Sequence, residues 1–382
     1  MIFEFFRPLS EDFIAFKDNL PHQALGTQIV CHTEEEFPKF EDVQIALIGV
    51  LDNRGGGDDS ATFDLTAVRK AFYQLFPGNW NMSIIDLGDI LPGEDQADTY
   101  YVLKNANAAL IKQGIVPLVL GGSQDLTYAM YRAYDQLEQM VNVVAVDSKF
   151  DLSREDKLSS DSYLTQMIIE EPNNLFNYCN IGFQTYFNSQ DEIDLIDKLY
   201  FDAYRLGDIS KNPKIAEPVF RDADLVSVDM TSVKSSASGN LENFNPNGFD
   251  GKEICTLSRY SGISDKVTSF GIFNQNGTRS EALLIAEILW YFIEGYSYRS
   301  FEFPYGDKSD YYRYIVPLEE EELIFYKSNK TGRWWIEIPI TPVSESKMSR
   351  NALLPCTQED YNAALQCEIP ERWWKAQKKN LL

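Results

Sequence analysis

The chain alternates between short apolar runs and longer segments in which apolar and polar residues mix. The apolar runs are rich in β-branched residues, which is typical of strands covered on both faces of a sheet. Helix-length segments separate them, so the pattern predicts repeated strand–helix units and a mostly parallel sheet. The expected strands are Val43–Val50, Met82–Leu87, Val116–Gly121, Asn142–Val146, Tyr178–Phe183, Ala203–Leu206, Ala223–Asp229 and Val267–Phe273.

Helices are expected between these strands, and together they predict a three-layer α/β/α fold with about eight strands. We assign this domain to residues 41–299, after an N-terminal extension of residues 1–40. Residues 300–382 form a C-terminal aromatic extension, for which we expect a hairpin turning at Asn329–Gly332 and paired tryptophans that pack on the main domain. The expected helices include Leu65–Phe76, Asp98–Gln113, Leu126–Glu138 and Ile193–Phe201.

Composition narrows the possible partners and compartments. The formal net charge of −24 disfavours nucleic acid and anionic membranes, because their phosphates would be repelled, and it leaves a cationic ligand or partner open. No apolar run is long enough to span a bilayer. The five cysteines are scattered without a CxxC pair, so neither a disulfide framework nor a zinc site is indicated. We therefore expect a cytoplasmic protein.

Polar residues follow three of the expected strands directly. Gly121–Asp125 follows one strand, Asp147–Asp151 the next, and Asp229–Thr231 a third. In open α/β sheets, ligands bind beyond the carboxyl ends of the strands. The sequence therefore predicts that carboxylates from all three strand ends, one glutamine and one lysine meet at one edge of the sheet.

These segments carry a resemblance to a known family. LVLGGSQDLT, VAVDSKFDL and LVSVDMTSV resemble, in order and spacing, the GGDHS, DAHxD and SxDxD motifs of the arginase, agmatinase and formimidoylglutamase (ureohydrolase) family. The resemblance spans about residues 40–295, and the overall size is similar to that of bacterial formimidoylglutamases. It implies an arginase-like fold, in which two histidines and four aspartates bind two manganese ions that activate a hydroxide against an amidine or guanidine carbon.

The chain departs from the family pattern at several of these positions. Gln124 and Lys149 stand where the family has its histidine ligands, and Thr231 replaces the second aspartate of SxDxD. Asn274 stands at the position of the glutamate that binds the substrate's guanidinium. The loop Ser153–Tyr163, where the resemblance places a proton-shuttling histidine, contains none. The positions that match the family metal site are Gln124, Asp147, Lys149, Asp151, Asp229 and Thr231.

These replacements act against metal binding. An ammonium about 4 Å from a dication costs on the order of 8 kcal/mol at an effective dielectric near 20. We therefore expect no cofactor, and we expect Lys149 to replace a metal by pairing with Asp147, Asp151 or Asp229. Any metal that did bind would use these three aspartates. Lys149 is also a candidate catalytic base or nucleophile, although neighbouring carboxylates would keep it charged.

Three hypotheses follow from the sequence. The leading one is a non-catalytic ureohydrolase-fold protein that binds a small cationic or amidine-like ligand, or a protein. The alternative is an active C–N hydrolase of the formimidoylglutamase, agmatinase or arginase type, with manganese in an altered or single-metal site. The third assigns residues 300–382 to binding a protein partner; a homo-oligomer is also open, because family members often assemble.

Overall fold

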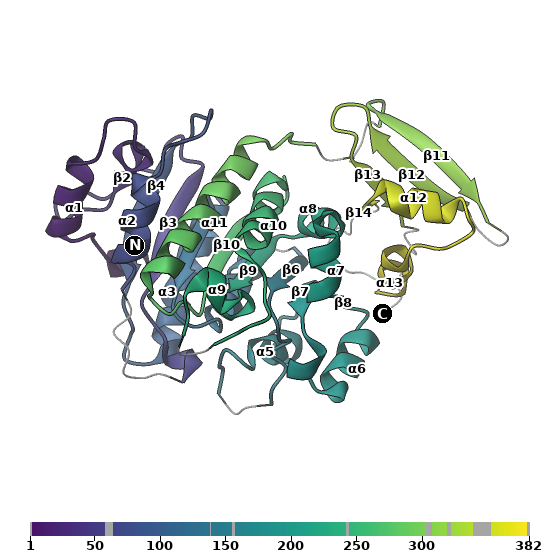
Figure 1. Cartoon of the computed structure of the whole chain (residues 1–382), viewed down its shortest axis with the longest axis horizontal. Helices are drawn as coiled ribbons and strands as arrows, with labels where there is room; N and C mark the ends of the chain where they lie inside the picture. The colour runs from purple at the N-terminus through teal and green to yellow at the C-terminus, as the bar shows by residue number, and fades with distance from the viewer. Residues whose placement is uncertain are drawn as a thin grey trace.

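A computed structural model describes residues 2–57, 64–137, 139–154, 157–241, 244–302, 304, 308–318, 322–338 and 353–379. Its main part is a central sheet of ten strands, in the order β1-β4-β3-β5-β10-β9-β6-β7-β8, with β2 also paired to β4 (Figure 1). All pairs are parallel except that of β1 with β4. The strands are β1 Phe6–Arg7, β2 Val30–Cys31, β3 Ile45–Val50, β4 Ile84–Ile90, β5 Val116–Gly121, β6 Val141–Val146, β7 Leu175–Phe183, β8 Asp202–Arg205, β9 Leu225–Asp229 and β10 Ser269–Phe273.

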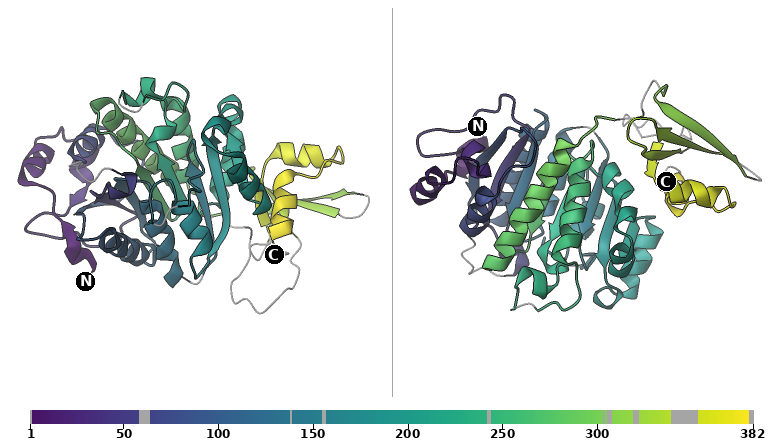
Figure 2. Two further views of the ribbon diagram at one scale, coloured as in Figure 1. Left: turned by 90° about the horizontal axis from the view of Figure 1, so that it is seen from below. Right: turned by 45° about the horizontal axis from the view of Figure 1, so that its top comes forward.

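Helices cover both faces of this sheet, which confirms the predicted three layers (Figure 2). Helices α1, α2, α7, α8, α10 and α11 contribute to the hydrophobic core of one face, and α3–α6 contribute to that of the other. The helices are α1 Glu11–Asp18, α2 Thr66–Gln74, α3 Gln96–Ile111, α4 Leu126–Arg132, α5 Tyr163–Ile169, α6 Gln190–Lys198, α7 Leu206–Lys211, α8 Glu217–Asp222, α9 Ser235–Ser238, α10 Gly251–Ile263 and α11 Arg279–Ser297.

The sheet is wider than expected because the N-terminal extension contributes to it. Strands β1 and β2 have two residues each, and both pair with β4. So short a strand leaves no alternation of apolar and polar residues that a sequence pattern could reveal. Strands from the N-terminal extension therefore belong to the central sheet.

The C-terminal extension folds as a four-stranded antiparallel sheet with two helices and its own hydrophobic core. The predicted hairpin is present as β12 and β13, which pair antiparallel on either side of Asn329–Gly332. Trp334 and Trp373 are buried in this core, whereas Trp374 is half-buried and packs edge-on against Tyr200 of the main domain. The elements are β11 Tyr311–Pro317, β12 Glu322–Ser328, β13 Trp334–Glu337, β14 Leu353–Cys356, α12 Gln358–Ala364 and α13 Glu371–Lys379.

The extension lies at one end of the main domain (Figure 1). Charged side chains hold it there. Arg221 of α8 donates to the carbonyl oxygens of Trp334 and Cys356, both at 3.0 Å. Its guanidinium also lies 4.6 Å from the ring centre of Trp335. On α13, Lys375 pairs with Asp202 at 3.6 Å. In the described part of the chain, no helix is long and apolar enough to cross a membrane.

Candidate functional site

The three aspartates that the sequence singles out lie at one edge of the sheet. Asp147 directly follows β6, and Asp229 ends β9, the strand next to it. Asp151 lies in the turn after Asp147. All three are buried, with 0 to 6% of their surface exposed. Parallel strands end at the same edge, so the predicted convergence is present in the structure.

Gln124 contacts Asp147 through its amide nitrogen. Its Nε2 donates to Asp147 Oδ2 at 2.7 Å and to the Tyr163 hydroxyl at 3.3 Å. The second oxygen of Asp147, Oδ1, accepts from the backbone N–H of Lys149 at 2.9 Å. Burial raises the pKa of Asp147, although these hydrogen bonds oppose the rise. At the first histidine position of the family, this chain therefore presents a hydrogen-bond donor to the aspartate.

Thr231 plays a similar part for Asp229. Its backbone N–H donates to Asp229 Oδ1 at 2.7 Å, and its hydroxyl donates to Oδ2 at 2.6 Å. Both carboxylate oxygens are thus engaged by one residue. Burial, followed by the charge of Asp147, nevertheless raises the pKa of Asp229 to about 8.

Asp151 is the least satisfied of the three aspartates. Its Oδ2 is buried and has no hydrogen-bond partner. Burial, and then the charges of Asp147 and Asp229, raise its pKa well above the usual range. The backbone at Asp151 is left-handed, with φ of 56°, a conformation that costs an aspartate little.

Lys149 does not pair with the aspartates, so that expectation is wrong. Its ammonium lies 3.1 Å from Asp161 Oδ1, and both side chains are about half exposed. Burial opposes the charged form, but the hydrogen bond and charge of Asp161 raise the pKa of Lys149 overall. The physical reason is desolvation: an ammonium beside Asp161 keeps much of its hydration, which it would lose among the buried carboxyls. A charged, outward lysine also suits neither a base nor a nucleophile.

Asn274 lies at the same edge, immediately after β10, in a left-handed conformation with φ of 55°. Its Oδ1 accepts from the backbone N–H of Gln124 at 3.1 Å, and its Nδ2 lies 3.5 Å from Gln124 Oε1. The residue at the family's substrate-binding position is therefore tied to the residue at a metal-binding position. Asp125, by contrast, accepts from the hydroxyls of Tyr100 in α3 and of Ser160, and so ties that helix to the loop before α5.

The structure adds residues that the sequence did not single out. Tyr163 of α5, Tyr178 and Asn180 of β7 are fully buried beside the aspartates, and Ser160 accepts from the backbone N–H of Gln124 at 3.0 Å. Asn180 Nδ2 donates to the backbone oxygen of Lys149 at 2.6 Å. The one available sequence signal was a polar asparagine in the middle of the expected strand Tyr178–Phe183. Of the glycine-rich loop beginning at Arg54, residues 58–60 lie outside the described part of the chain.

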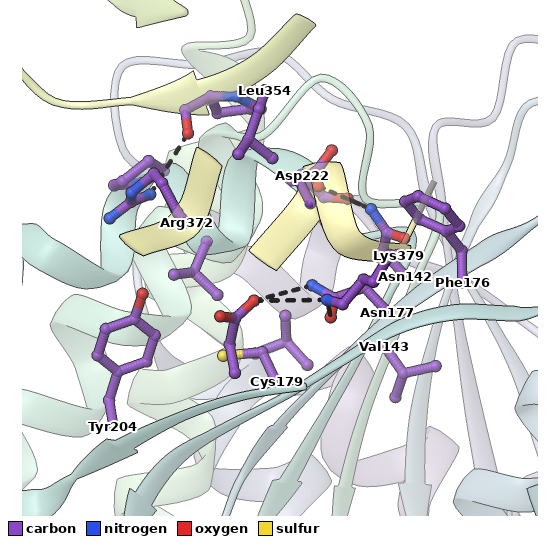
Figure 3. A pocket seen from close by; sticks show the side chains of 16 residues that line it. Asn142, Val143, Phe176, Asn177, Cys179, Tyr204, Asp222, Leu354, Arg372 and Lys379 are labelled. Atoms are coloured by element: carbon purple, nitrogen blue, oxygen red, sulfur yellow. Dashed lines mark hydrogen bonds and ion pairs between the residues drawn. The ribbon is translucent and has the colours of Figure 1, made fainter. Parts of the chain in front are cut away.

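A second feature is a cavity of about 40 Å³ between the starts of β6–β8 and the C-terminal helix (Figure 3). Arg372 and Tyr204 line one side of it, and Lys379, Asn177 and Asp222 line the other (Figure 3). Lys379 donates to Asn177 Oδ1. A space of this size holds one or a few water molecules. We therefore interpret it as a polar gap in the contact between the two domains and not as a substrate site.

Among the residues that the structure describes, no group of three or more histidine, cysteine, aspartate or glutamate side chains is arranged to hold a metal ion. The three aspartates instead meet hydrogen-bond donors from Gln124, Thr231 and the backbone of Lys149. The arrangement can take a proton or an organic cation, since burial and mutual repulsion both favour neutralising the carboxylates.

Comparisons with known proteins agree with this fold. The arginase family profile matches residues 43–279. Formimidoylglutamases are similar in sequence: that of a Geobacillus species is 23% identical over 238 residues, 58% of this chain and 72% of the relative. That of Staphylococcus aureus strain MSSA476 is 24% identical over 243 residues, 60% of this chain and 77% of the relative.

Solved structures show the same architecture. The formiminoglutamase of Trypanosoma cruzi, solved with Mn²⁺, superposes with a TM-score of 0.61 at 18% identity, covering 68% of this chain and 96% of that protein. The formimidoylglutamase of Bacillus subtilis gives a TM-score of 0.61 at 20% identity, covering 70% of this chain and 91% of that protein. At these identities the likeness establishes the fold alone.

Proposed function

Because the chain belongs to the arginase family, we propose that it is a non-catalytic member that binds a small cationic or amidine-like molecule at the aspartate edge. The observation that carries the proposal is the role of Gln124, Lys149 and Thr231. These three residues stand at positions where the family has metal ligands. Gln124 donates a hydrogen bond to Asp147, and Thr231 donates one to Asp229. The ammonium group of Lys149 pairs with Asp161 and with neither of these two aspartates.

The side chains present do not fit two divalent ions. The six family positions carry four aspartates and two neutral histidines, and the corresponding residues here carry three aspartates and one lysine. A dication beside Asp147 would meet the N–H of Gln124 and would lie near a lysine ammonium. Amide and hydroxyl oxygens are weak ligands for manganese, so binding to Gln124 or Thr231 would offset little of this electrostatic repulsion. We therefore derive no reaction step through a metal at this site.

The ligand class follows from charge and from the relatives. The net charge of −24 attracts cations over a long range, and the buried aspartates favour any molecule that neutralises them. The relatives are formimidoylglutamases by name, so a formimino or other amidine compound is a reasonable first probe.

Metal content tests the proposal directly. Purified full-length protein, incubated with excess MnCl₂ and dialysed, is expected to contain well under one equivalent of manganese per chain by elemental analysis. It is also expected to leave formimino and guanidino compounds unhydrolysed. The matched control is a triple variant, Gln124→His with Lys149→His and Thr231→Asp, which restores the family ligand types and is expected to retain manganese. Two equivalents in the unaltered protein, together with enzyme-like hydrolysis, would contradict the proposal.

The second candidate is an active C–N hydrolase with an altered or single-metal site. The observation in its favour is the unpartnered Oδ2 of Asp151 beside two retained aspartates, because an unsatisfied buried carboxylate is also what a missing ion leaves behind. This function requires amidine hydrolysis that Asp229→Asn and a chelator both abolish. Activity that survives either treatment would exclude it.

A role of residues 300–382 in binding a protein remains a separate proposal. Strand β11 lies at one edge of the small sheet, and its Tyr312 and Ile315 are exposed, at 60% and 47%. An exposed edge strand with apolar side chains can pair with an extended segment of another chain.

A further inference from the structure

A cavity of about 320 Å³ lies where the main domain meets the C-terminal domain. This volume is within the range of pockets that bind small molecules. The cavity shares no residue with the aspartate edge or with the smaller cavity of Figure 3. Both domains line it, the main domain with Lys214, Glu217, Arg221 and Tyr260 and the C-terminal domain with Arg333 and Trp334.

The lining carries an excess of positive charge, although the chain as a whole has a net charge of −24. Among the described residues that line the cavity, Lys214, Arg221 and Arg333 are cations and Glu217 is the one acid, so two positive charges remain in excess. Asp265, which lies outside the lining, pairs with Arg333 at 3.3 Å and reduces the excess to one. A concave surface with an excess of one sign of charge attracts ligands of the opposite sign. The cavity therefore favours an anion.

The lining also has more hydrogen-bond donors than acceptors. In the described part of the chain, Lys214 is exposed and forms no ion pair, and the hydroxyl of Tyr260 forms no hydrogen bond. The Nε of Arg333 lies 3.8 Å from Glu217 Oε1, which is too far for a hydrogen bond. The Nε of Arg221 lies 3.0 Å from the same oxygen but has no hydrogen-bond partner. A ligand that complements this lining must bring acceptor oxygens as well as negative charge.

Arg221 fixes the two sides of the cavity relative to each other. It is buried in α8 of the main domain, with 7% of its surface exposed. Its guanidinium donates to the backbone oxygens of Trp334 in β13 and Cys356 in β14. The lining groups of both domains are thus held in place by contacts within the protein, and a ligand does not have to order them.

We propose that this cavity binds a phosphate dianion, either free or as the terminal group of a small phosphomonoester. Phosphate carries close to two negative charges at neutral pH, and its oxygens accept from ammonium, guanidinium and hydroxyl donors. Lys214, Arg333 and Tyr260 supply one donor of each kind. A carboxylate has one charge and two oxygens, so it would satisfy fewer of these donors.

A bound phosphate would join the two domains. Lys214 and Tyr260 belong to the main domain, and Arg333 immediately precedes β13 of the C-terminal domain. A ligand that contacts both sides binds only while the domains are docked, so it stabilises the docked state. Phosphate is therefore expected to slow hydrogen exchange of the β13 and β14 amides and to leave those of β5 and β6 unchanged.

Calorimetric titration of the full-length protein with sodium phosphate, at constant ionic strength in chloride, tests the proposal. We expect a Kd of about 1 mM or tighter. Lys214→Gln is expected to weaken binding about tenfold, the effect of a lost charge-assisted hydrogen bond, and Tyr260→Phe about threefold. Neither side chain bonds to another described residue, so both variants are expected to fold normally, which circular dichroism checks. Lys39→Gln makes the same charge change at an exposed position outside the cavity and is expected to have no effect.

Glycerol phosphate and acetate distinguish the possible ligands. Tighter binding of glycerol phosphate than of inorganic phosphate assigns the cavity to a phosphomonoester, and the reverse order assigns it to the free ion; both results support the proposal. Three results would overturn it: no binding of either phosphate, a Kd that Lys214→Gln leaves unchanged, or acetate binding as tightly as phosphate. Because the cavity lies apart from the aspartate edge, none of these outcomes bears on the manganese test of the proposed function.

Discussion

Replacing Asp151 by asparagine is expected to stabilise the protein by about 1–2 kcal/mol at neutral pH. The substitution keeps the shape of the side chain and removes a buried carboxyl whose Oδ2 has no partner. Asparagine also tolerates the left-handed backbone of this position, where φ is 56°. Chemical denaturation monitored by circular dichroism measures the change in the free energy of unfolding.

This gain is expected to depend on pH. Burial and the charges of Asp147 and Asp229 raise the pKa of Asp151 in the folded protein, whereas in the unfolded chain it is near 3.9. Below about pH 4 both states are protonated, and the carboxyl costs nothing. Above that, the unfolded chain releases the proton and the folded one retains it, so the stability of the unaltered protein falls as pH rises toward the folded pKa. The advantage of Asp151→Asn should grow over the same range.

The control is Asp161→Asn, which removes a half-exposed carboxylate from the same region. It loses only the ion pair with Lys149, so its free energy of unfolding is expected to change by less than about 0.5 kcal/mol. A clear loss of stability in Asp151→Asn at neutral pH would contradict the expectation. It would indicate a resident cation on the aspartates, and would favour the hydrolase hypothesis.

Replacing Arg221 by methionine is expected to destabilise the attachment of the C-terminal domain by about 3 kcal/mol. The guanidinium is buried and satisfies the carbonyl oxygens of Trp334 and Cys356. It also pairs with Glu217 at 3.0 Å and covers the ring of Trp335. Methionine would fill much of the space but would leave two buried carbonyl groups without donors.

Hydrogen exchange is the appropriate measurement, because it separates local opening from global unfolding. Amides of β13 and β14 should exchange faster in Arg221→Met, while those of β5 and β6 should keep their protection. Arg313→Met removes an exposed arginine from β11 of the same domain and is expected to leave both groups unchanged. Uniform loss of protection across both domains would show that the two parts unfold as one unit.

The central strands could be predicted because most of their residues are apolar, and a sheet covered on both faces requires such a pattern. All eight predicted strands are present in the sheet, with ends shifted by a few residues. Strands β1 and β2 could not be predicted, because two residues are too few to show an alternation of apolar and polar positions. The tryptophans were expected to pack on the main domain, but Trp334 and Trp373 mainly fill a core that the extension forms itself.

The membership of the candidate site was easier to predict than its contacts. Asp147 follows β6 and Asp229 ends β9, and because these parallel strands are adjacent, topology alone brings the two residues together. The direction of the Lys149 side chain depends on Asp161, twelve residues further along, and on how deeply the aspartates are buried. Neither is encoded in the motif around Lys149. The role of Asn180 depends on which face of the sheet its side chain leaves. That face is known only once the pairing of β7 with β6 is known.

The distribution of tryptophan gives the protein a built-in optical reporter. Of the six tryptophans, four lie within residues 334–374, and the other two are Trp80 and Trp290 of the main domain. Near-ultraviolet emission therefore follows chiefly the environment of the C-terminal sheet and helices. A red shift of that emission, without a change in the far-ultraviolet dichroism of the central sheet, would record the small domain separating in real time, with no added label.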